Sequence, residues 1–229
     1  MLRTPITLTA AALAAALTLS ACGTVRLGAA AVTNTSRIPT ATVTAEVSNL
    51  DAAYKADKAK VQLQFPVSQM PQEVLSWLLR FRVRDQMAER NHLTITRGQV
   101  QQALASAAAQ AKQSGVTLTQ LAVANGVPPD QLPALGRYVA IQNQLLARMD
   151  GGTLPTASSA LQALGTRFAT SQCRAAKSLG IQVNPQFGEL DYSQVSVIPA
   201  PNKLAADPGT ASPSPSASAT SSPQLTPAC

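Results

Sequence analysis

Apolar residues recur every three or four positions along most of the chain, a spacing that places them on one face of a helix. This pattern predicts a first helix over about residues 40–61 and a second over about residues 71–90. The second has the wider apolar stripe, which consists of Leu75, Leu79, Val83 and Met87 with Val74, Leu78 and Phe81 beside them. We therefore expect the second helix to form the centre of the core.

Two capping boxes predict where the next helices begin. In a capping box, a threonine side chain accepts a hydrogen bond from the backbone of a glutamine three residues later, and the glutamine side chain accepts one in return. Thr96 with Gln99 predicts a third, alanine-rich helix that ends near Gly115. Thr117 with Gln120 predicts a short fourth helix.

The rest of the pattern predicts two more helices, one hairpin and an unstructured end. Apolar periods predict a long helix over about residues 135–149 and a last helix over about residues 158–179. Residues 29–39 hold two short apolar pieces around a polar turn, which predicts a β-hairpin. Residues 199–229 are rich in Pro, Ser, Ala and Thr and cannot bury enough apolar surface to offset chain entropy. The predicted fold is mainly α: a multi-helix domain over residues 29–198, with a short N-terminal β-hairpin and a disordered C-terminal tail.

The first 22 residues have the pattern of an export signal, with an early arginine, a short apolar stretch and small residues at its end. The stretch is shorter than the roughly 20 residues that span a bilayer. Leu19-Ser20-Ala21-Cys22 resembles the bacterial lipobox, whose cysteine is acylated before cleavage. We expect a lipoprotein signal peptide over residues 1–21, lipid attachment at Cys22 and a lipid-anchored tether over residues 22–28. Acyl chains such as palmitate would hold the protein at the extracytoplasmic face of the cell membrane.

Charge and composition exclude only a few kinds of binding partner. The formal charge is +7, from 18 Lys and Arg against 11 Asp and Glu. This excess suits an anionic surface, but scattered arginines also simply keep an alanine-rich protein in solution. Aromatic residues make up only 3% of the chain, which argues against base stacking, so we expect no nucleic-acid partner.

Residues that carry chemistry are few, and we expect neither an enzyme nor a bound metal or cofactor. The single histidine, His92, falls in a predicted turn, and no nucleophile motif, Gly-rich phosphate loop or zinc-ligand spacing occurs. Asp85 and Glu89 share a helix face, as paired catalytic carboxylates can, but Arg82 nearby favours a solvated charged face. Arg80, Arg82 and Arg84 alternate along the same helix and do not form one basic stripe.

Cys173 and Cys229 form a candidate disulfide. An exported protein meets an oxidising compartment, and the bond would close a loop of about 56 residues. Pairing also requires the tail to fold back onto the last helix, and nothing in the tail gives a reason for that. The sequence leaves the pairing open.

Four motifs, in order, resemble SurA-type and PrsA-type bacterial chaperones. Residues 30–39 are similar to that family's opening strands, and residues 90–100 to the entry of its third helix. Residues 135–146 resemble the long helix that follows, and residues 183–188 resemble a closing Val-Asn-Pro-Arg-Tyr-Gly motif of short lipoprotein relatives.

The match departs from the family at two residues and lacks one domain. Thr35 replaces the family's turn glycine, and Gln186 replaces the arginine of the closing motif. No length remains for the parvulin-type domain of full-length relatives, so we expect no prolyl isomerase activity.

The resemblance implies a helical domain that holds unfolded exported proteins without catalysis. The candidate residues for a client-binding cleft are Trp77, Leu78, Phe81, Tyr138 and Ile141. Ordinary core packing is the competing interpretation for each of them. The competing function is that of a structural or adaptor lipoprotein that binds one folded envelope partner; a small-ligand carrier ranks third because no two-lobed α/β pattern occurs.

Overall fold

The computed structural model describes residues 28–152, 157–200 and Cys229, and this part of the chain is mainly helical. The six described α-helices are α1 (Thr40–Ala56), α2 (Met70–Arg90), α3 (Arg97–Gln113), α4 (Leu118–Ala124), α5 (Leu132–Met149) and α6 (Ser158–Ser178). Short 3-10 helices, η1 (Val67–Gln69) and η2 (Pro129–Gln131), precede α2 and α5. The expectation of a mainly helical domain is confirmed.

The described strands form two small antiparallel sheets. The predicted N-terminal hairpin is present as β1 (Ala29–Val32) and β2 (Arg37–Pro39). The late strand β3 (Gln182–Val183) pairs with the other edge of β1 and completes a three-stranded sheet. A second hairpin joins β4 (Glu189–Asp191) to β5 (Ser196–Ile198). The sequence pattern did not predict β3, β4 or β5.

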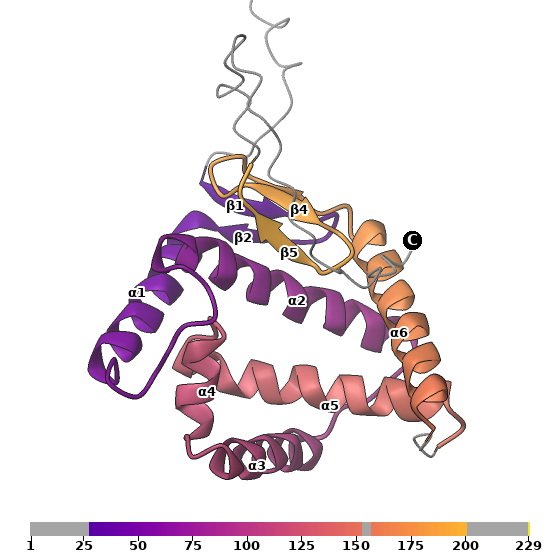
Figure 1. The fold of residues 1–229 in the computed structure, drawn as a ribbon. Coiled ribbons are helices and arrows are strands. Elements are labelled where there is room, and N and C mark those ends of the chain that lie inside the picture. Colours follow the sequence, from indigo (N-terminus) through magenta and orange to yellow (C-terminus); the bar gives the residue numbers. More distant parts are fainter. Residues whose placement is uncertain (1–27, 153–156, 201–228) are drawn as a thin grey trace, which may run out of the picture.

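Helix α2 lies at the centre of the molecule, as its wide apolar stripe predicted. It contacts α1, α5, α6 and β5, and Figure 1 shows the strands on one side of it and α5, with α3 beyond, on the other. Leu75, Leu79, Val83 and Met87 are all buried in the main core. The strands therefore pack on one side of α2, and α5 packs on the other.

Both predicted capping boxes are present, and they fix the starts of α3 and α4. The Gln99 backbone N–H donates to Thr96 Oγ1 at 3.3 Å, and the Thr96 N–H donates to Gln99 Oε1 at 2.8 Å. Thr117 and Gln120 make the same reciprocal pair. These boxes satisfy backbone donors that a helix start otherwise leaves unpaired.

The predicted end of the first helix was wrong, because α1 stops at Ala56 and not near residue 61. After Tyr54 the next positions on the apolar face are occupied by Asp57 and Lys58, which have nothing to bury. The chain turns there and returns to the core at Val61, which is buried.

Several sequence expectations lie outside the described residues: the signal peptide over residues 1–21, Cys22 with nearly all of its tether, and residues 201–228 of the tail. Within the described residues, no helix is both long enough and apolar enough to cross a membrane.

Candidate binding site

Three aromatic side chains gather where α2 meets α5. Trp77 and Phe81 stand one turn apart on α2, and Tyr138 faces them from α5. The ring centroids of Trp77 lie 5.7 Å from those of Phe81 and of Tyr138, and the two contacts with Tyr138 are edge-on. The Trp77 indole N–H donates to the Asn125 carbonyl at 2.7 Å, which fixes the ring against the end of α4.

Beside Trp77, an apolar pocket of about 200 Å³ opens between α3, α4 and α5. It contains no charged side chain, and Asn125 is its one polar residue. Its lining is Trp77, Ala103, Leu104, Ala107, Leu118, Leu121, Ala122, Asn125, Val127, Leu135, Gly136 and Val139. Leu121, on the rim, is 38% exposed, so the pocket offers apolar surface to solvent.

Small residues on facing helices allow α3 and α5 to lie close together beside this pocket. A Cβ atom at Gly136 would lie 2.6 Å from Cγ of Leu104, closer than two carbon atoms can approach. The alanine-rich face of α3 packs along α5 from there. The missing side chain at Gly136 thus sets the spacing of the two helices.

The five predicted cleft residues do not lie in one cleft. Trp77 lines the apolar pocket, whereas Leu78 and Phe81 line a separate pocket of about 270 Å³ whose wall includes charged residues. Tyr138 belongs to the aromatic cluster.

The prediction that Ile141 lines the cleft was wrong. Ile141 is fully buried in the main core. It lies three residues after Tyr138 and shares the buried face of α5 with Leu145. Apolar periodicity cannot tell which edge of a wide stripe remains accessible.

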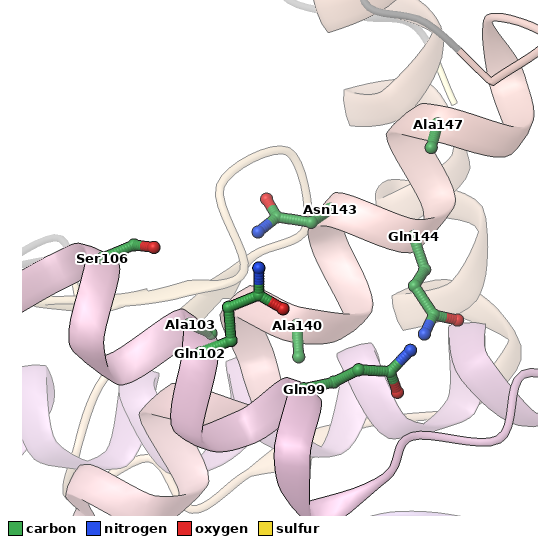
Figure 2. A pocket seen from close by; sticks show the side chains of 8 residues that line it. All are labelled: Gln99, Gln102, Ala103, Ser106, Ala140, Asn143, Gln144 and Ala147. Atoms are coloured by element: carbon green, nitrogen blue, oxygen red, sulfur yellow. The ribbon is translucent and has the colours of Figure 1, made fainter.

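A second pocket between α3 and α5, of about 310 Å³, is lined by carboxamides and was not predicted. Its residues are Gln99, Gln102, Ala103, Ser106, Ala140, Asn143, Gln144 and Ala147. Figure 2 shows the amide of Gln102 pointing toward that of Asn143, and the amide of Gln99 toward that of Gln144. Ala103 and Ala140 are buried beneath them. We call this space the amide pocket; Ala103 also lines the apolar pocket.

Arg84 of α2 is only 2% exposed, an outcome the sequence did not predict. Its guanidinium lies between two rings, 4.2 Å from the centroid of Tyr138 and 4.5 Å from that of Phe168. It donates to Oε1 of Gln172 at 3.0 Å and of Gln142 at 3.5 Å, and no described carboxylate pairs with it. Burial lowers the pKa of Arg84, an effect that Tyr138 partly offsets.

Glu46 of α1 is a second buried ionisable side chain. Gln131 of η2 donates to its Oε1 at 2.7 Å, while its Oε2 has no hydrogen-bond partner among the described residues. Burial raises the pKa of Glu46, and the neighbouring Asp130 carboxyl raises it further. The hydrogen bond from Gln131 and the nearby Asn49 amide act in the opposite direction.

The structure joins Cys173 to Cys229 in a disulfide, with Cα atoms 5.8 Å apart. Cys173 lies buried on α6, so the bond returns the far end of the chain to the folded domain. The sequence had left this pairing open.

The sequence also raised His92 and Asp85 as residues that can carry chemistry. His92 is exposed in the turn after α2, with a backbone φ of 49°. Asp85 forms an ion pair with Arg137 of α5 at 2.8 Å and does not pair with Arg82. Among residues 28–152 and 157–200, no group of three or more His, Cys, Asp or Glu side chains is arranged to hold a metal ion.

Set against known proteins, the chain matches no family model, and no curated protein or solved structure matches it. The fold and the site define a mainly helical domain with two neighbouring, partly exposed pockets between α3, α4 and α5 that no charged residue lines.

Proposed function

We propose that this protein is a non-catalytic chaperone with a helical domain of the SurA and PrsA type, which holds unfolded exported proteins. In this proposal the acylated Cys22 anchors it at the extracytoplasmic face of the cell membrane. The observation that carries the proposal is the apolar pocket beside Trp77, which is uncharged and has Leu121 exposed at its rim. An unfolded client differs from a folded protein mainly in the apolar side chains that it exposes.

The size of the pocket suits weak and reversible binding. A volume of about 200 Å³ accommodates one or two aliphatic side chains. Burying one such side chain contributes roughly 1.5 to 3 kcal/mol, and association itself costs at least about 4 kcal/mol. Useful affinity therefore requires several contacts along the client, and each contact can be released easily.

Leu121→Gln tests the pocket directly, because it changes an exposed rim residue and leaves the core unaltered. Leu161 provides a matched control: it is 45% exposed on α6 and does not line the apolar pocket. With the full chain reconstituted in lipid nanodiscs, we expect suppression of aggregation of a chemically unfolded exported protein. Leu121→Gln should need several-fold more protein for the same effect, whereas Leu161→Gln should behave as wild type.

An adaptor role is the second candidate, and the charged pocket beside Leu78 favours it. Arg37, Arg82 and Asp85 line that pocket. A fixed pattern of charges suits one folded partner better than many unrelated clients. A wild-type protein that leaves aggregation unchanged at every ratio, and that crosslinks to one partner at fixed stoichiometry, would replace the chaperone with the adaptor.

The anchor is tested separately from the pocket. Cys22→Ser should move the protein from the membrane fraction to the soluble extracytoplasmic fraction, while Cys229→Ser should leave it with the membrane. Mass spectrometry of the first mature peptide should show the acyl chains. An unmodified peptide at Cys22 would remove the lipoprotein assignment and leave the pocket argument intact.

A further inference from the structure

The amide pocket differs from an ordinary solvated helix surface in its lack of charge. No charged residue stands between Arg97 and Lys112 on α3, or between Arg137 and Arg148 on α5. Exposed helix faces usually carry lysine, arginine and glutamate. Here the exposed positions over the pocket are Gln102, Ser106 and Asn143, all of them uncharged.

The lining identifies the chemistry of the ligand. Each carboxamide offers two N–H donors and one carbonyl acceptor, which is the same functional group as a peptide bond. Without a formal charge, the pocket has no preference for an anion or a cation. Its buried floor is formed by the methyl side chains of Ala103 and Ala140, so an extended backbone can approach closely.

The position of the pocket adds a second requirement. Because Ala103 lines both spaces, a ligand that occupies the amide pocket lies next to the apolar pocket. A polypeptide supplies amide groups and apolar side chains at adjacent positions. A glycan supplies hydroxyls, and no aromatic ring lines the amide pocket for a sugar to stack on.

We infer that the amide pocket binds the backbone of an extended segment of an unfolded polypeptide, with a neighbouring apolar side chain of that segment in the apolar pocket. This inference rests on the proposed chaperone function and specifies what the client presents. Contacts with peptide groups are independent of client sequence, because every residue other than proline carries the same donor and acceptor. A holding site for many different exported chains needs this property.

Backbone recognition is tested with a pair of capped, fluorescent peptides of alternating leucine and serine. In the second peptide the serine nitrogens are methylated, which removes backbone donors and keeps every apolar side chain. Anisotropy titrations with the full chain in nanodiscs should show binding of the first peptide and about tenfold weaker binding of the second.

The variant Gln102→Leu, Asn143→Leu should bind the unmethylated peptide about tenfold more weakly and lose most of its sensitivity to methylation. The control Gln101→Leu, Gln110→Leu changes two exposed glutamines of α3 outside the pocket and should behave as wild type. Circular dichroism and urea unfolding would show that all variants retain their fold.

The outcomes separate the two proposals. Equal binding of both peptides by wild type, with binding still lost in Leu121→Gln, would overturn backbone recognition and leave the chaperone standing. Failure to bind either peptide would overturn both. Displacement by N-acetylglucosamine oligomers, with no sensitivity to methylation, would assign the amide pocket to a glycan.

Discussion

Replacing Arg84 by lysine should destabilise the protein more than replacing it by methionine, although lysine retains the charge. The guanidinium is planar and lies between the rings of Tyr138 and Phe168. An ammonium is a compact and strongly hydrated charge that cannot stack on two rings at once. Methionine instead fills a similar apolar volume and removes the buried charge.

The magnitudes follow from the contacts. Two desolvated cation–π contacts contribute up to about 2 kcal/mol each, and the hydrogen bond to Gln172 contributes roughly 1.5 kcal/mol or more. Arg84→Lys loses most of the stacking and keeps the desolvation cost, so the free energy of unfolding should fall by about 2 to 4 kcal/mol. Arg84→Met loses the same contacts but avoids the several kcal/mol that burial of a charge costs, and should remain within about 2 kcal/mol of wild type.

Urea unfolding followed by the fluorescence of Trp77, the only tryptophan, measures these differences. The control is Arg82→Lys, an exposed change two residues away that should cost less than about 0.5 kcal/mol. A lysine variant as stable as wild type, together with a strongly destabilised methionine variant, would show that charge is what this position requires. The stacking argument would then be refuted.

Three further substitutions test a close helix contact, a buried carboxyl group and a buried hydrogen bond. Gly136→Ala forces α3 away from α5 and should cost about 1 to 3 kcal/mol in urea unfolding despite better helix propensity, whereas Gly98→Ala, which meets only an ordinary contact, should not destabilise. The pKa of Glu46 is raised in the folded protein, so the folded state holds this proton more strongly than the unfolded state does. The free energy of unfolding should therefore fall as pH rises above about 4.5. Glu46→Gln should remove that decline. Ser76→Ala should cost about 1 to 3 kcal/mol, because the buried Val197 N–H donates to Ser76 Oγ at 2.8 Å; a melting temperature equal to wild type would contradict this.

Local signals accounted for the helices. Each capping box, at Thr96 and at Thr117, depends on residues within one turn of one another, and the apolar stripe of α2 repeats from turn to turn. The local sequence is therefore enough to predict these helices. The first helix was predicted too long because the pattern was continued past Tyr54 into charged residues. Even there the error concerned an end and not the existence of the helix.

The late strands depend on partners far away in the chain, which is why the pattern missed them. The N–H of Asn184 donates to the Ala30 carbonyl, and β3 lies against β1 across about 150 residues of sequence. β4 and β5 have three residues each, too few to show an alternation of apolar and polar positions. β5 packs on α2, where Val197 is buried and bonded to Ser76.

Arg84 and the amide pocket were missed for a different reason. An arginine in a charged helix looks solvated unless the opposite helices are known, and here Tyr138 and Phe168 come from α5 and α6. The glutamines of α3 look like ordinary surface residues until α5 places Asn143 and Gln144 opposite them. In both cases the residue type was visible in the sequence but its neighbours were not.

The side chains of α2 belong to two separate clusters, and this explains why the predicted cleft divided. Leu75 and Leu79 lie in the main core, whereas Trp77 and Phe81 belong to the smaller cluster against α5. Phe81 is itself buried, so its truncation would leave a cavity and destabilise the fold as well as alter the cluster. Only residues at the rim of the pockets, such as Leu121 and Gln102, can be changed without that cost. Loss of client binding in those rim variants, with an unchanged free energy of unfolding, is therefore the result that would distinguish a binding surface from a core.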